Sequence, residues 1–511
     1  MEYAAEPRSG ALDANLMPDD IYQRVVTRRG AEFTILRQAV TVAVFAGVIV
    51  ALNFYAPEHS TPAERLCGSL MIVILAVPLW LWRLGIDRNP PFIVLISLVY
   101  FCTYGFGVFL LEKFAGNVYQ QDVSPRWVEA ALRLSIAGMV CMIAGYYAFP
   151  WTPLNAITPR FRMKWTDARA VKLAAVIMAF GGLLFSLGGI PGLPKSLAQV
   201  QGYAQNTCTI GVCAVIGLWW MGRLGRVSGS LLLAVLVPPR LGIGMVGGAS
   251  GGAIVITFTL VLMYAALAHR IPWILVFVGT AAIFVIRPLE IPYRAATWDP
   301  SGELYGASSL QKAEYMSNLV YRTTVGGEVP PDTLIQIAGG RLSMFPTLAD
   351  VMAQTPSIIP YWGGVTYYPL LAKPIPRFVW PDKPEEVTGR TFGHRYGYTG
   401  IDNPGTSINL PQVVEQYANF GRFGVYIGMF IIGMIYRALL GMFIHPEMGF
   451  GGLIAGVFIV SSLFDLESST SLVFGNIPWT LVYLFAINLF VMMLHFELSG
   501  LEQRTATSQQ A

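Results

Sequence analysis

The densest group of residues that could do chemistry is the stretch from Lys373 to Pro384, Lys-Pro-Ile-Pro-Arg-Phe-Val-Trp-Pro-Asp-Lys-Pro. Its prolines restrict the backbone, so Lys373, Arg377 and Lys383 are expected to project from a rigid, aromatic-lined ribbon. Arginine suits phosphate because its planar guanidinium donates paired hydrogen bonds and stays charged. The stretch therefore predicts a site for a phosphorylated ligand. The alternative is a folded loop whose arginines pair with its own acids.

A second feature is Pro238-Pro239-Arg240, which is followed by six glycines within twelve residues. We expect the proline pair to end one apolar segment and the glycine-rich turn to enter the next. Backbone amides in such a turn can approach an anion closely, with Arg240 as the counter-charge. The glycines could equally allow close helix packing. A charge at membrane depth favours a functional role for Arg240.

Two acidic groups are a third feature: Asp465 with Glu467, and Glu58 with His59. Either pair could hold a cation, but a solvated loop is the simpler interpretation of both. The sequence contains no run of ligands with the spacing of a metal site, and none is predicted.

The composition places these residues in a membrane protein. Of the 511 residues, 54% are apolar and 13% charged, whereas about a quarter of the residues of soluble domains are charged. The net charge of +4 is too small and too scattered to indicate nucleic-acid binding. The first 30 residues have no apolar core, so no cleavable signal peptide is predicted.

Apolar stretches predict an all-α polytopic protein with about twelve transmembrane helices. The stretches lie near 38–56, 66–82, 92–111, 134–149, 173–190, 208–221, 227–237, 252–268, 271–286, 423–443, 450–464 and 472–494. With the N-terminus inside, 17 of the 34 Lys and Arg residues fall on the cytoplasmic side and six in the short outer loops. This asymmetry predicts that both termini are cytoplasmic.

The remaining basic residues lie in one long segment, 287–422, which is predicted to be a large outer loop. Residues 307–322 and 332–353 are expected to form amphipathic surface helices, and residues 360–411 an ordered, irregular loop. The predicted organisation is an N-terminal segment 1–37, helices within 38–286, the loop 287–422, helices within 423–494 and a tail 495–511.

Two motifs resemble those of bacterial Wzy-type polymerases of oligosaccharide repeat units, such as the O-antigen polymerases. One is the stretch Gly363–Lys383 with its Ile-Pro-Arg-Phe-Val-Trp-Pro-Asp-Lys-Pro core. The other is Glu-Gln-Tyr-Ala-Asn-Phe-Gly-Arg-Phe-Gly, residues 415–424, which leads into an apolar span. Many helices and one large outer loop are also similar to that family.

The resemblance implies a metal-independent inner-membrane enzyme with a fold similar to C-type glycosyltransferases and no cofactor. Such enzymes work on the periplasmic face and join repeat units carried on undecaprenyl pyrophosphate into O-antigen or exopolysaccharide. The implied partners are this lipid-linked glycan and the bilayer, with a chain-length regulator and a flippase as further candidates and no nucleic acid.

The resemblance also implies roles for single residues. Pyrophosphate would be held by Arg377, Lys383, Arg390 and Arg395, with Arg240 from the membrane side. Fixed cations facing the leaving oxygens favour cleavage of a glycosyl–pyrophosphate bond. The acceptor hydroxyl needs a proton acceptor, for which His394 and Glu415 are the candidates, with Asp402 behind them. Trp362, Tyr367, Tyr368 and Trp380 could pack on sugar faces or anchor the loop at the membrane interface.

Three alternatives stay open. An O-antigen ligase or a related lipid-linked glycan transferase shares the architecture and differs in its acceptor. A transporter fits twelve spans, but one long loop after the ninth breaks the symmetry of two halves. A metal-dependent C-type glycosyltransferase would use Glu58, His59, Asp465 or Glu467.

Overall fold

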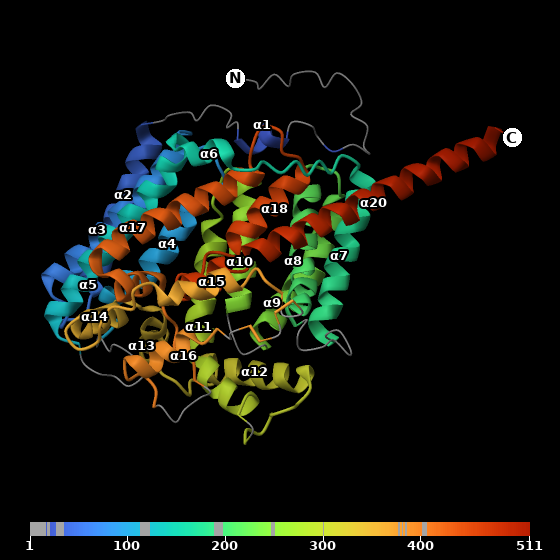
Figure 1. Cartoon of the computed structure of the whole chain (residues 1–511). Coiled ribbons are helices and arrows are strands. Elements are labelled where there is room, and N and C mark those ends of the chain that lie inside the picture. Colours follow the sequence, from blue (N-terminus) through green and yellow to red (C-terminus); the bar gives the residue numbers. More distant parts are fainter. Residues whose placement is uncertain are drawn as a thin grey trace.

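The structure is a computed structural model that describes residues 17, 21–26, 35–112, 123–188, 198–246, 251–299, 301–376, 379–380, 382–383, 386–400 and 406–510. Within these ranges the chain is helical, with connecting turns and no β-strand (Figure 1). The prediction of an all-α fold is confirmed.

Eight helices are long and apolar enough to cross a membrane, so the protein is a helical membrane protein. They are α2 (Ile35–Tyr55), α3 (Pro62–Arg83), α5 (Pro125–Ala148), α7 (Ala168–Gly188), α9 (Arg226–Val246), α11 (Trp273–Thr297), α17 (Gln412–Phe443) and α20 (Ile477–Gln510). The other four predicted apolar stretches lie in α4 (Phe92–Tyr104), α8 (Ala198–Trp220), α10 (Gly251–Ala268) and α18 (Phe450–Ser461).

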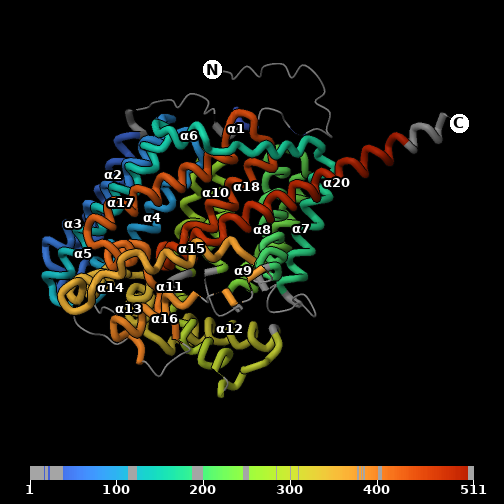
Figure 2. Tube along the Cα trace, viewed as in Figure 1, coloured from blue at the N-terminus to red at the C-terminus, as the bar shows by residue number. Residues whose placement is uncertain are grey.

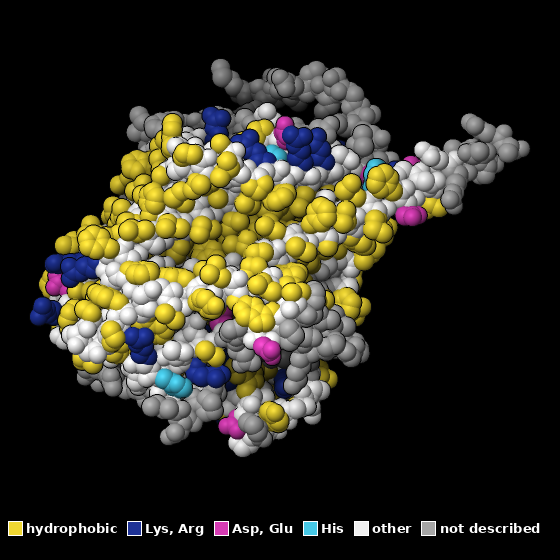
Figure 3. All heavy atoms as spheres, in the orientation of Figure 1, with side chains coloured by type: hydrophobic (Ala, Val, Ile, Leu, Met, Phe, Trp, Pro, Cys, Tyr) yellow, Lys and Arg dark blue, Asp and Glu magenta, His cyan; other side chains and the backbone are white. Residues whose placement is uncertain are grey.

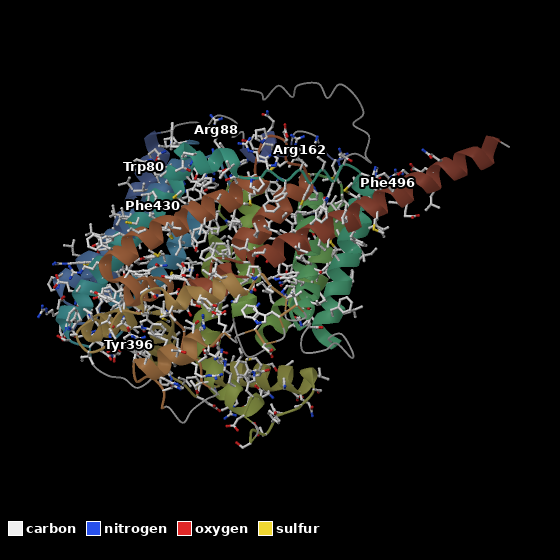
Figure 4. All side chains as sticks on the ribbon, viewed as in Figure 1. Trp80, Arg88, Arg162, Tyr396, Phe430 and Phe496 are labelled. Carbon is white, nitrogen blue, oxygen red and sulfur yellow. The ribbon has the colours of Figure 1, made fainter. Side chains whose placement is uncertain are left out.

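The helices form a bundle with two end faces, which are joined by the long helices (Figures 1 and 2). The terminal face carries α1 (Ile21–Val26), α6 (Pro153–Ile157) and the end of α20. The loop face carries α12 (Ser309–Thr324), α13 (Pro331–Leu342), α14 (Phe345–Gln354) and α16 (Thr388–Arg395). Figure 3 shows apolar side chains in a band between these faces, with the charged ones gathered mainly above and below it. In Figure 4, Arg88 and Arg162 lie at the terminal face and Tyr396 at the loop face.

Large apolar side chains project outward from the band. Phe54 in α2 is 80% exposed, and Ile274 and Phe277 in α11 are 79% and 80% exposed. A water-soluble protein does not present such a continuous apolar belt, because exposing it to water would be costly. The belt fits the hydrocarbon core of a bilayer.

The helices α5 and α17 pack closely because glycines let their backbones meet. A Cβ atom added at Gly145 would overlap the carbonyl oxygen of Phe430, and one at Gly433 would overlap that of Met142. Small residues at such crossings are the usual means of close packing between membrane helices.

Three boundaries differ from the prediction. Pro238 and Pro239 lie inside α9 and do not end it, since the helix continues to Val246. Membrane helices tolerate proline where neighbouring groups satisfy the freed carbonyls. α11 runs to Thr297, well past residue 286. α17 already begins at Gln412 and is kinked where Phe420 and Gly421 leave helical geometry.

The predicted surface helices are present with altered limits. Residues 307–322 correspond to α12, whose N-cap Ser308 forms a capping box with Gln311. Residues 332–353 are divided between α13 and α14, which are interrupted at Ser343 and Met344. Where the structure describes it, the irregular stretch 360–411 contains only short helices: η4 (Val365–Tyr367), α15 (Tyr368–Ala372) and α16.

Candidate functional site

The candidate site is built on an interruption between two apolar helices. α18 ends at Ser461, and the chain is non-helical until α19 (Thr470–Phe474) begins; we call residues 462–471 the polar break. Most of it is buried, although its sequence contains Asp465, Glu467 and several hydroxyl groups. Non-helical backbone in a membrane protein survives where protein groups satisfy it. Here the backbone and side-chain amides of Gln412 donate to the carbonyls of Leu466 (3.1 Å) and Asp465 (3.3 Å).

Glu415, in the first turn of α17, is the most deeply buried acid facing the break. Its side chain is fully buried, and its Oε2 accepts hydrogen bonds from the backbone N–H and the hydroxyl of Thr470, both at 2.6 Å. The second oxygen, Oε1, is buried and accepts no hydrogen bond of good geometry from a described residue, although the Thr366 hydroxyl is close enough to interact with the carboxylate. A buried polar atom without a partner is costly and commonly marks a functional group.

A second carboxylate, Glu386, contacts the same break. Lys373 forms an ion pair with it, and the hydroxyls of Ser469 and Ser471 donate to its Oε1. Lys373 Nζ also donates to the carbonyl of Ser471 at 2.8 Å. Glu415 and Glu386 are close enough to interact electrostatically. We call Glu415, Glu386, Lys373 and residues 469–471 the carboxylate cluster.

The motif that begins at Glu415 also positions the loop beside it. Asn419 donates to Thr366 Oγ1 (2.8 Å), and its own side-chain oxygen accepts from the backbone N–H of Gly364 (2.8 Å). Tyr367 donates to Gln416 Oε1 at 2.7 Å. Gly421 has φ +65°, a conformation that glycine adopts without strain. The motif therefore holds the predicted sugar-packing segment against the start of α17.

Charged residues of three elements meet on the other side of the break. Arg287 in α11 pairs with Glu290 (3.7 Å) and with Glu467 of the break (3.4 Å), and Arg294 pairs with Glu290 (3.1 Å). Arg341 of α13 lies near these groups and makes no ion pair within the described residues. We call these five residues the arginine cluster.

Burial changes the protonation of this cluster. Loss of hydration raises the pKa of Glu467 to about 7, although Arg287 opposes the shift. Asp465 and Glu290 raise it further, because they place negative charge nearby. Burial also lowers the pKa of Arg341. Asp465 and Glu467 are therefore not the solvated loop that the sequence favoured.

The predicted cations of the loop face have different surroundings. Lys383 Nζ donates to the carbonyls of Lys373 (3.1 Å) and Ile375 (3.0 Å), so it holds the loop. Arg395 donates to the carbonyl of Pro360 (2.7 Å) and lies over the ring of Trp362. Arg390, in α16, is exposed and makes no ion pair with a described residue. His394, also in α16, and Trp380 are half-buried.

Three predicted features need a separate statement. Arg377, Asp402 and the middle of the glycine-rich turn, residues 247–250, lie outside the described residues. Arg240 is buried inside α9, with 8% of its surface exposed and no hydrogen-bond partner for Nε in the described chain. It lies near Cys208 of α8, and it forms no ion pair with a described residue of either cluster.

The arginine cluster was missed from the sequence, as was the role of Glu386. Arg287, Glu290 and Arg294 recur at intervals of three and four residues, the signal of one helix face. Because the helix was predicted to end at residue 286, these three residues were assigned to the loop and not to one helix face. Nothing in the sequence indicates that Glu386 and Lys373 meet the chain about 90 residues further on.

Comparison with known proteins gives one similarity. A family described as a domain of unknown function (DUF8712) matches residues 251–497, slightly less than half of the chain. This region includes α10 to α20 and so contains both clusters. Neither curated proteins nor solved structures gave a significant match.

Proposed function

We propose that this protein is a Wzy-type membrane glycosyltransferase that polymerises repeat units carried on undecaprenyl pyrophosphate into surface polysaccharide. In this proposal the chain crosses the bacterial inner membrane twelve times, and α4, α8, α10 and α18 are the four spans beyond the eight long apolar helices. Both termini are cytoplasmic, and the loop face, with both clusters, faces the periplasm.

The observation that carries the proposal is the burial and the hydrogen bonding of the Glu415 carboxylate. A carboxylate that is buried, held at one oxygen by Thr470 and unpaired at the other has the features of a positioned general base. It belongs to one of the two motifs that resemble the polymerase family, and it faces the polar break between α18 and α19.

The proposed reaction is a single displacement. The hydroxyl oxygen of the acceptor sugar forms a bond to the anomeric carbon of the growing chain. At the same time, Glu415 Oε1 accepts the proton of that hydroxyl. The bond from that carbon to the pyrophosphate oxygen breaks, and the electron pair leaves with the lipid pyrophosphate. His394 and Asp402 are the alternative proton acceptors.

Cations near the break would stabilise the leaving pyrophosphate. Arg341 and Arg390 are the described candidates without an ion pair, and Arg377 is a third candidate on the basis of the resemblance alone. Lys383 and Arg395 would instead hold the loop that presents these groups.

The test is the lipid-linked glycan profile of cells with and without the protein. Loss of long polymer, together with accumulation of carrier lipid bearing one repeat unit, is the expected result. Long polymer that persists on its lipid carrier would contradict polymerisation and favour the ligase alternative.

A transporter is the second candidate, and two observations favour it. The interrupted α18–α19 region and the buried Arg240 of α9 resemble the broken helices and intramembrane charges of transport proteins. Repeat units trapped on the cytoplasmic side of cells that lack the protein would support transport and overturn the polymerase proposal.

A further inference from the structure

A pocket separate from both clusters opens between the loop-face ends of α5 and α17. It has a volume of about 340 Å³. Its lining consists of Arg126, Glu129, Ala130, Arg133 and Leu134 of α5 with Arg422 and Tyr426 of α17. Dark-blue side chains gather at this edge of the molecule in Figure 3, where Figure 1 labels α5.

The pocket is framed by rigid helices. α5 and α17 are locked together further along by the close approaches at Gly145 and Gly433. The kink at Phe420 and Gly421 then redirects α17 just before Arg422. The charged lining is therefore carried by two packed helices, which keep its groups in fixed positions.

The pocket has an excess of positive charge. Three arginines face one carboxylate, Glu129, and that carboxylate already pairs with Arg133. Arg126 lies over the ring of Trp127, and neither it nor Arg422 makes an ion pair with a described residue. Two guanidinium groups are thus available for a phosphate, which they can bind through paired hydrogen bonds.

The surface next to the pocket is apolar. Phe423, Ile427 and Ile431 are 75%, 60% and 48% exposed and recur every four residues along α17. Side chains at this spacing form one stripe on a helix, which here runs from the pocket into the apolar band. A soluble anion would make no use of this stripe, whereas the acyl chain of a lipid would cover it.

We propose that this pocket binds the phosphate headgroup of an anionic phospholipid, with an acyl chain along Phe423, Ile427 and Ile431. Arg126 and Arg422 bind the phosphate, and Arg133, held by Glu129, adds positive charge. The site does not depend on the proposed polymerase activity, because none of its residues belongs to either cluster.

The experiment measures retention of phosphatidylglycerol by the purified full chain, using native mass spectrometry, with phosphatidylcholine as the zwitterionic comparison. Wild type should retain phosphatidylglycerol in preference to phosphatidylcholine. The double variant Arg126→Gln/Arg422→Gln should bind it at least about tenfold more weakly, since both charge-assisted contacts to the phosphate are lost. The control Arg322→Gln removes an exposed arginine of α12 and should bind like wild type.

A second variant tests the charge argument if the double variant does not fold. Among the described residues that line the pocket, Glu129 is the one carboxylate, so Glu129→Gln should tighten phosphatidylglycerol binding several-fold. Unchanged binding in Glu129→Gln, or in a double variant that folds, would overturn the proposal. Equal displacement by millimolar inorganic phosphate and by the lipid would identify a site for soluble anions instead. Selective displacement by a polyprenyl pyrophosphate would assign the pocket to that lipid rather than to a phospholipid.

Discussion

Thr470 donates two hydrogen bonds to a single oxygen of Glu415, one from its backbone N–H and one from its hydroxyl, each 2.6 Å long. The two residues are far apart in sequence and belong to α17 and α19. Their contact fixes the carboxylate against the start of a short helix through Oε2 and leaves Oε1 without a hydrogen bond from Thr470. In this arrangement Oε2 holds the side chain in place, and Oε1 is the oxygen proposed to accept a proton.

Glu415→Gln should abolish polymer formation while leaving the amount of membrane-inserted protein unchanged. The amide oxygen of glutamine can still accept both hydrogen bonds from Thr470, but the side chain no longer takes up a proton. The measurement is the glycan ladder on a gel together with an immunoblot of membranes. Glu303→Gln, an exposed acid of the same face, is the control and should retain activity. Normal ladders in Glu415→Gln would exclude Glu415 as the base.

Arg287→Ala should destabilise the protein by up to about 3–5 kcal/mol, because it removes the ion-pair partner of the half-buried Glu467 and leaves the buried Glu290 with Arg294 alone. Thermal unfolding in detergent measures the effect. Arg322→Ala breaks the exposed pair with Glu328 and should cost less than about 1 kcal/mol. Equal losses in the two variants would show that the arginine cluster is solvated.

Stability should fall as the pH rises from about 5 to 8, in part through Glu467. The pKa of this carboxyl is about 7 in the folded protein and near 4.5 when unfolded, so the folded state holds the extra proton between these values. Removing that proton costs about 1.4 kcal/mol for each pKa unit of difference. Arg287 and Arg341 oppose the effect, whereas Asp465 and Glu290 add to it. Glu467→Gln should flatten the dependence of the melting temperature on pH, and an unchanged slope would contradict this assignment.

Gly433→Ala should destabilise the bundle, since the added methyl group would overlap the carbonyl oxygen of Met142 in α5. Gly441→Ala is the matched control in the same helix, because a Cβ there meets no atom within 4 Å. Alanine at that site should be neutral or stabilise the helix by roughly 0.5–1 kcal/mol. Melting temperatures of both variants provide the measurement. A Gly433→Ala variant as stable as wild type would mean that α5 and α17 can separate without loss.

The sequence by itself determined the class of the fold. Apolar stretches bounded by charge, proline and glycine predict helices, and most of each stretch is helical in the structure, although the last one, 472–494, is divided between α19 and α20. The reason is local, because a helix satisfies its own backbone and needs only an apolar sequence to lie in lipid. The same local logic predicted the helical segments of the long loop, whereas Glu415 and its motif became candidates through their resemblance to motifs of a known family.

The tertiary structure alone decided which charged residues share a site. Lys373 and Lys383 belong to one proline-rich stretch, yet one pairs with Glu386 at the polar break and the other holds backbone carbonyls. Glu467 was interpreted as a solvated loop residue, but α11 brings Arg287 to it from 180 residues away. Burial and pairing depend on which helices pack together. No spacing along the chain encodes that packing, so the arginine cluster and the pocket between α5 and α17 became visible only in three dimensions.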